Sequence, residues 1–318
     1  MSHHYGVVVA VDGSRASHAA VRWAAAEAAR RGASLYVVHI CEFENASLWP
    51  TPSLQADLRQ LSQPIVTEAI AEANQVAPEV TVTGEVLMGG TTRMLIGLSR
   101  SADLLVLGRS GKGSLARHLV GSLTSRMAAH AQCPMVAVPA APDGGDGPAA
   151  GFEPAGKIVV GMGYHPTEGR ALRFAVAEAE LRHGAATLAV RAWHGPAGLA
   201  IDPDNPPVSP MFAEEAEQHA LSAELVDKLR DVSCHQPPRP VVRAGQPSGV
   251  LSGLCHPGDL LVLGQHRHNQ PFMPATAGRV IAECLHQAPC PVAVVPEPVI
   301  AIDTEPRRVA ETAGFLGY

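Results

Sequence analysis

The sequence predicts an α/β fold made of two tandem, doubly wound parallel five-stranded sheets. Three observations support this: the chain repeats itself, it contains short apolar runs typical of buried strands, and helical patterns separate those runs. The segment Asp103–Gly108 recurs letter for letter as Asp259–Gly264, and Cys133–Pro139 recurs in similar form as Cys290–Pro296. These features return in the same order about 150 residues later, which indicates a tandem duplication.

Five apolar runs of the first half predict strands, at residues 7–11, 35–40, 80–87, 104–107 and 135–138. Helical patterns separate them, at residues 17–31, 55–74, 91–100 and 122–130. The second half repeats this plan, with strands expected near residues 158–162, 187–192, 240–243, 260–263 and 292–295. Runs that are apolar on both faces are typical of parallel strands covered by helices, and the β-α alternation predicts an open doubly wound sheet.

Composition narrows the class of protein. With 318 residues the chain exceeds one typical domain, and 46% hydrophobic with 17% charged residues indicates a globular protein. A net charge of −6 argues against a general nucleic-acid binder. No signal peptide or membrane-spanning run is visible, and the six cysteines lack CxxC spacing, so we expect reduced thiols in a cytoplasmic protein.

The repeat defines the expected domain organisation. Residues 1–139 form the first domain and residues 156–297 the second. Residues 140–155 between them are rich in Gly and Pro and lack apolar periodicity, which is typical of a linker. Residues 298–318 have no counterpart in the first half, and we expect a disordered tail.

Two loops of the first half have the composition of a phosphate site. Val11–Ser14 follows the first strand, Gly108–Ser114 follows the fourth, and Gly121 with Ser122 opens the last helix. Glycines let backbone amides approach an anion, and a helix N-terminus adds donors and a favourable dipole. Ligands of doubly wound sheets bind beyond the carboxyl ends of the strands, where the strand order reverses. We therefore predict an anion site formed by these loops.

Two other phosphate motifs fit less well. Gly111–Ala116 imitates the dinucleotide pattern G-x-G-x-x-[GA], but it follows the fourth strand, and no acidic residue lies at a strand end about 20 residues on. The Walker A pattern is absent, because Val106 and Gly113 stand where it requires Gly and Ser or Thr.

The glycine spacing is more specific than the composition. Gly108, Gly111, nine residues and then Gly121-Ser122 give the pattern G-x-x-G-(x)9-G-[ST], which resembles that of ATP-binding universal stress proteins. The Val-Asp-Gly-Ser opening, the run Leu35–His39 and the Cys-Pro before the last strand resemble the same family. The resemblance covers residues 5–139 and 156–297.

This resemblance implies a strand order of 3-2-1-4-5 and one ATP in the first domain, with the need for Mg²⁺ left open. It implies that Ala10 and Asp12 lie near adenine and ribose, where many members have Pro or Gly in place of this alanine. It implies that backbone near Ile40 contacts the base, that residues 107–113 surround the ribose and phosphates, and that residues 121–124 hold the phosphate end. The implied ATP contacts are Ala10, Asp12, Ile40, Leu107, Gly108, Arg109, Ser110, Gly111, Lys112, Gly113, Gly121, Ser122, Leu123 and Thr124.

The second half departs from this pattern. Gly163 stands in place of Asp12, Arg267 in place of the second glycine, and Gly278-Arg279 in place of Gly121-Ser122. We predict that this half binds no ATP in the family manner and serves as a pseudo-subunit, with binding of another anion as the alternative. The pair His266 and His268 in the same loop lacks a third ligand, so we expect solvated histidines and no metal site.

The family resemblance also bears on assembly and function. In this family the last strand commonly pairs antiparallel with that of a partner subunit, so the duplicated chain is expected to make this contact internally, with further homodimerisation left open. The predicted function is nucleotide-dependent regulation in a stress response, through an unidentified protein partner and without nucleic acid or membrane. The motif loops offer no obvious base for a water, so no catalytic residue is assigned. The alternatives are a slow ATPase or nucleotide-dependent transferase, and a nucleotide-free scaffold.

Overall fold

The computed structural model describes residues 4–42, 51–109, 122–140, 156–163, 169–193, 210–230, 234–265 and 277–297. Apart from Ala140, the predicted linker lies outside the described residues, and so does the whole predicted tail.

The first half contains every strand and helix that the sequence predicts, and their ends differ from the expected ones by only a few residues. Helix α2 begins earlier than expected because Thr51 caps it and Pro52 occupies the first turn, where no backbone N–H is needed. The elements are β1 (Tyr5–Ala10), α1 (Arg15–Arg31), β2 (Leu35–Glu42), α2 (Pro52–Val76), β3 (Val82–Gly89), α3 (Thr91–Leu98), β4 (Ala102–Arg109), α4 (Ser122–His130) and β5 (Met135–Pro139).

The second half repeats the same order of elements and contains all five expected strands. They are β6 (Ile158–Gly161), α5 (Gly169–Leu181), β7 (Thr187–Trp193), α6 (Pro210–Lys228), β8 (Arg239–Ala244), α7 (Pro247–Gly253), β9 (Leu260–Gly264), α8 (Arg279–Gln287) and β10 (Val292–Val295).

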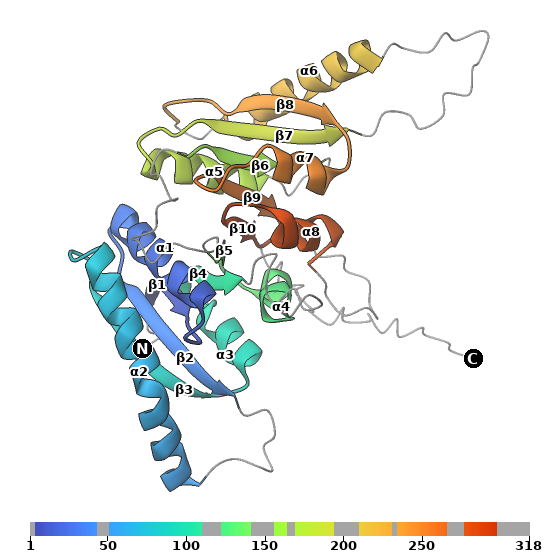
Figure 1. Ribbon diagram of the computed structural model, residues 1–318. Coiled ribbons are helices and arrows are strands. Elements are labelled where there is room, and N and C mark those ends of the chain that lie inside the picture. The colour runs from blue at the N-terminus through green and yellow to red at the C-terminus, as the bar shows by residue number, and fades with distance from the viewer. Residues whose placement is uncertain are drawn as a thin grey trace, which may run out of the picture.

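The strands of both halves join into one sheet of ten strands, in the order β3-β2-β1-β4-β5-β10-β9-β6-β7-β8. The order 3-2-1-4-5 is thus confirmed in the first half, and the second half mirrors it. Strands are parallel within each half, whereas β5 and β10 pair antiparallel at the centre, with Val136 opposite Ala293. The two expected sheets are therefore continuous, because the two apolar edge strands cover each other (Figure 1).

The sheet is covered by helices on both faces. One buried core lies between the sheet and α1, α2, α5 and α6, and the other between the sheet and α3, α4, α7 and α8. Successive residues of β1 alternate between the two cores, with Val7 and Val9 in the first and Val8 in the second. This burial of both faces explains why the strands read as continuous apolar runs.

Helices α1 and α5 meet across the two halves in a buried group of charges, which we call the α1–α5 cluster. Glu27 and Glu178 are fully or almost fully buried, and the repeat makes them equivalent. Arg31 donates to Glu178, and its equivalent Arg182 donates to Glu27 at 2.8 Å, so the contact is reciprocal, as in a twofold interface. Arg30, which has no charged counterpart in α5, also donates to Glu27, at 3.0 Å.

All six cysteines are free thiols, and four of them are buried. Within the described part of the chain, no helix combines the length and the apolar character that crossing a membrane requires.

Candidate functional site

Strands β1 and β4 are neighbours in the sheet, and their connections leave on opposite faces. Ala10 lies opposite Leu107, so the segments that follow them begin side by side at the carboxyl edge of the sheet. From β1 the chain enters α1 on one face, and α4, the helix that follows β4, covers the other face. This is the point where the strand order reverses, the position at which doubly wound sheets bind ligands. We call it the β1–β4 switch point.

Asp12 lies exposed in the turn that joins β1 to α1. Its Oδ1 accepts a hydrogen bond from the backbone N–H of Ser14 at 2.9 Å, and Ser14 in turn caps α1 by accepting from the N–H of Ser17 at 3.2 Å. Desolvation by the surrounding chain raises the pKa of Asp12, but hydrogen bonds from Ser14 and Ser17 outweigh it and hold this pKa below its ordinary value. Asp12 is therefore ionised at neutral pH, and its carboxylate can accept hydrogen bonds.

Gly108 brings the end of β4 against the first turn of α1. A β-carbon at this position would lie 2.5 Å from the backbone carbon and oxygen of Ala16, and 2.7 Å from the nitrogen of Ser17. Only glycine permits so close an approach of two backbones. Gly108 thus allows the end of β4 to pack directly against the helix that follows Asp12.

The end of β2 completes the described rim of the switch point. His39 donates through Nδ1 to the carbonyl oxygen of Val11 at 2.8 Å, which fixes the residue before Asp12. Ile40 lies opposite Leu87 in the sheet and is partly buried against the core on the α3 and α4 face.

Only some of the predicted ATP contacts lie in the described part of the chain. Leu107 and Thr124 are buried, so Leu107 can offer a ligand only its backbone. Ala10 and Leu123 are partly buried against the core, and Ser122 opens α4. Lying outside the described residues are Ser110, Gly111, Lys112, Gly113 and Gly121.

Arg109 lies at the end of β4, but its side chain is directed into the second half. It is 6% exposed, and its Nη2 donates to the carbonyl oxygens of Ala288 and Cys290, the latter at 3.1 Å. Burial lowers the pKa of this guanidinium. The side chain of Arg109 is therefore occupied at the contact between the halves and is not available to a ligand at the switch point.

The equivalent switch point of the second half is built differently. Gly163 stands where the first half has Asp12, and its carbonyl oxygen accepts from Nη2 of Arg191 at 2.7 Å. Arg191, the equivalent of His39, is buried and forms an ion pair with Glu224 of α6. Arg279 lies exposed at the start of α8 and donates to Glu283 at 2.7 Å. Arg267 and the two histidines beside it lie outside the described residues.

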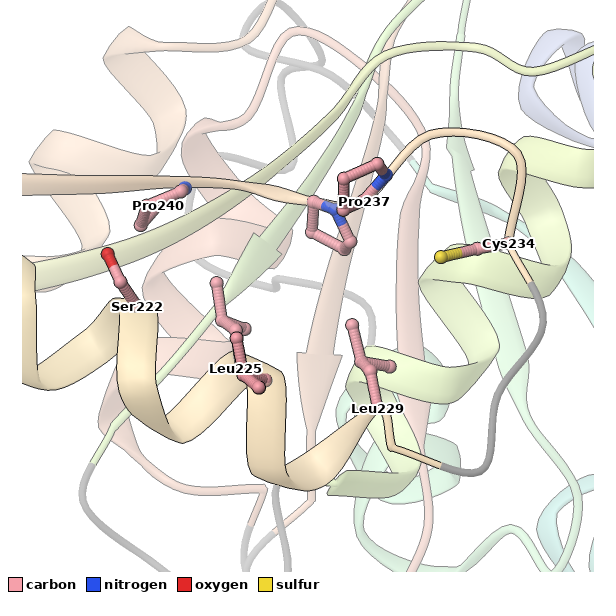
Figure 2. A pocket seen from close by; sticks show the side chains of 8 residues that line it. Ser222, Leu225, Leu229, Cys234, Pro237 and Pro240 are labelled. Atoms are coloured by element: carbon pink, nitrogen blue, oxygen red, sulfur yellow. The ribbon is translucent and has the colours of Figure 1, made fainter.

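An apolar groove lies elsewhere in the second half, with a volume of about 330 Å³. Leu225 of α6 and Leu229, just after this helix, point toward Pro237, which precedes β8, and Pro240 within β8 (Figure 2). Its lining is almost entirely apolar and offers no charged group to a phosphate. The groove is therefore not an alternative location for the anion site predicted from the sequence.

Comparison with known proteins identifies the family. The model of the universal stress protein family matches residues 6–139 and 155–296, so this chain belongs to the universal stress protein family. Universal stress protein Rv1996 of Mycobacterium tuberculosis strain H37Rv is 31% identical over 315 residues, and the alignment covers 92% of this chain and 96% of that protein.

Solved structures share the fold. A universal stress protein from Archaeoglobus fulgidus DSM 4304 has a TM-score of 0.64 at 11% identity, and the alignment covers 92% of this chain and 98% of that one. A universal stress protein solved in complex with cAMP is 27% identical, with a TM-score of 0.34, and matches 44% of this chain and 100% of its own.

Proposed function

We propose that the first domain binds one ATP at the β1–β4 switch point, and that this universal stress protein is a nucleotide-dependent regulatory protein. Asp12 holds the ribose, backbone near Ala10 and Ile40 contacts the base, and α4 with the preceding glycines holds the phosphates. The proposed contacts are Ala10, Asp12, Ile40, Leu107, Gly108, Arg109, Ser110, Gly111, Lys112, Gly113, Gly121, Ser122, Leu123 and Thr124, with Arg109 acting through its backbone.

The observation that carries this proposal is that Asp12 and Gly108 lie at the carboxyl ends of neighbouring strands. An ionised carboxylate follows one strand and a glycine lies at the end of the neighbouring strand, where the strand order reverses. A carboxylate at the carboxyl edge of a doubly wound sheet lies in the ligand crevice, and its oxygens can accept hydrogen bonds from ribose hydroxyls. The start of α4 on the opposite face supplies unpaired N–H groups and a positive dipole end for phosphate.

The second domain supports the binding of one ATP per chain. Its equivalent position carries Gly163 in place of the carboxylate, and the nearby Arg191 is buried and paired with Glu224. A buried, paired guanidinium gives no net positive charge to an incoming phosphate.

The proposed role is regulation, because the sequence of the motif loops offers no obvious general base for hydrolysis. Asp12 is the only acidic residue in the motif loops, and it is assigned to binding. A regulatory role requires that the bound and free forms differ in free energy toward a partner.

The test is isothermal titration calorimetry with ATP on the wild type, recording stoichiometry as well as affinity. Asp12→Asn keeps the side-chain shape but removes the charge, and we expect ATP affinity to fall about tenfold. Gly163→Asn changes the equivalent position of the second half and serves as the matched control, with unchanged affinity expected. Gly111→Val is expected to abolish binding.

Three other results of these measurements would change the proposed function. Two ATP per chain would show that the second domain also binds. No heat, together with no nucleotide retained on purification, would reject ATP binding and favour a scaffold. Phosphate release that disappears in Asp12→Asn would favour the enzyme alternative.

A further inference from the structure

Arg109 and Gln265 are equivalent residues of the two halves. Each directly follows the repeated segment Asp-Leu-Leu-Val-Leu-Gly, and each is at most 6% exposed. Gln265 belongs to none of the sequence motifs, although its position immediately after the repeat is visible in the sequence. The side chains of both residues cross to the opposite half.

The two crossings form a reciprocal pair of contacts. Arg109 donates to the carbonyl oxygens of Ala288 and Cys290, at and just beyond the end of α8. Gln265 donates through Nε2 to the carbonyl oxygen of Ala129, in the last turn of α4. Both side chains therefore satisfy carbonyl groups that a helix end leaves without intrahelical partners.

The dipole of α8 favours the contact made by Arg109. A helix C-terminus carries a partial negative charge, so a guanidinium there is stabilised by the helix dipole. Among the described residues, no carboxylate forms a salt bridge with Arg109, and its buried Nε has no hydrogen-bond partner. The end of α8 therefore supplies the principal stabilisation of this buried charge that the described residues provide.

These contacts flank the proposed nucleotide site. Arg109 ends β4 next to Gly108, and α4 is the helix whose N-terminus is assigned to phosphate. The second half thus contacts the elements that form the site in two places. The end of α8 binds Arg109 at the end of β4, and Gln265 binds the C-terminal end of α4.

We propose that the second domain acts as the positioning support of the ATP site in the first domain, with Arg109 and Gln265 as positioning residues, and that ATP binding strengthens the contact between the domains. This inference rests on the proposed function. It gives a role to a half that has lost its own motif. Because linkage is reciprocal, a domain contact that favours ATP must itself be favoured by ATP.

The direct test changes Gln265, which belongs to the second domain and lies outside the proposed set of ATP contacts. Gln265→Met preserves the length and removes the donor, and we expect ATP to bind the first domain about five- to tenfold more weakly. Arg109→Lys keeps the charge but loses the planar fork, and a similar loss is expected.

Arg31→Gln is the control, because it removes a contact between the halves at the opposite end of α1, about 25 Å from Ser14 along the helix. We expect it to lower the unfolding midpoint without changing ATP affinity. Equal ATP affinity in the wild type, Gln265→Met and Arg31→Gln would overturn the inference while leaving ATP binding intact. Absence of ATP binding in the wild type would overturn the proposed function and this inference together.

A second measurement needs no variant. Hydrogen exchange on the wild type, with and without ATP, is expected to slow at amides of α8 and β10, which lie in the second domain. Protection confined to the first domain would overturn the inference, even if Gln265→Met proved too unstable to purify.

Discussion

The two halves of this chain share one fold but differ at the carboxyl edges of their strands. In the first half the turn after β1 presents Asp12, ionised and exposed. In the second half the equivalent turn presents Gly163, and Arg191 with Glu224 forms a buried ion pair nearby. Because the sheet and its helices are retained in both, the residues that maintain the fold are separable from those proposed to bind a ligand.

Identical residues of the repeated segment Asp-Leu-Leu-Val-Leu-Gly have different surroundings in the two halves. Gly108 lies against the backbone of α1. Among the described residues, a β-carbon on its equivalent Gly264 would lie 3.6 Å from the Cβ of Ala171, an ordinary contact. Asp103 is about half exposed, whereas its equivalent Asp259 is 6% exposed. The duplicated motif has therefore been adapted to different surroundings.

The largest expected difference lies in the α1–α5 cluster. Burial alone would raise the pKa of Glu27, but Arg182, Arg31 and Arg30 outweigh it and hold that pKa at about 2. Burial and then the charge of Glu27 raise the pKa of Glu178 to about 7. We expect Glu27→Gln to lower the free energy of unfolding by about 3 kcal/mol or more, because three guanidinium groups lose their shared carboxylate. At about pH 6, Glu178→Gln is expected to cost less than about 1 kcal/mol, because Gln resembles the protonated acid.

The pH dependence sharpens this comparison. A glutamate of the unfolded chain titrates near 4.5, so between that pH and about 7 the folded protein keeps a proton on Glu178 that the unfolded chain has lost. Wild-type stability from this group is therefore full below pH 4.5 and falls as the pH rises through about 7. Urea denaturation from about pH 5 to about pH 8 should show Glu178→Gln gaining stability relative to the wild type. Parallel curves for the two proteins would contradict the assignment.

The next difference concerns the equivalent glycines Gly108 and Gly264. Gly108→Ala forces a methyl group into the backbone of α1, and we expect a loss near the upper end of about 1–3 kcal/mol. Gly264→Ala adds a methyl group whose only near neighbour among the described residues is the Cβ of Ala171, and we expect a change within about 0.5 kcal/mol. Thermal unfolding of both variants measures this, and equal losses would show that α1 shifts freely away from β4.

Much of the fold could be predicted because its signals are local and repeated. Apolar runs such as residues 104–107 are buried on both faces, and their alternation with helical patterns leaves few topologies. The joining of the two sheets followed from the apolar edge strands and the family resemblance. The α1–α5 cluster could not be predicted, because Glu27 and Arg182 are far apart in sequence and look like ordinary residues of solvated helices.

The candidate site was predictable in part for the same reason. Asp12 and Gly108 each follow a recognisable apolar run, so their position at the ends of neighbouring strands could be anticipated. The direction of the Arg109 side chain could not, since its partners Ala288 and Cys290 are backbone carbonyls that any residue offers. A hydrogen bond to a backbone carbonyl oxygen cannot be recognised from the sequence, because every residue has this acceptor.

The smallest expected difference separates Asp259 from Asp103. Asp259 accepts hydrogen bonds from the N–H of Lys157 at 3.0 Å and of His256 at 2.7 Å, and pairs with Nζ of Lys157 at 2.6 Å, so it anchors the start of β6. Asp103 has an exposed partner, His4, at 3.1 Å. We expect Asp259→Asn to cost about 1–1.5 kcal/mol, because the neutral amide loses the ion pair and keeps only one good acceptor. Asp103→Asn is expected to stay within about 0.5 kcal/mol, since exposed pairs contribute little. Urea denaturation midpoints of the two variants decide the matter, and a loss at Asp103 as large as at Asp259 would mean that the repeated aspartate stabilises both strand starts alike.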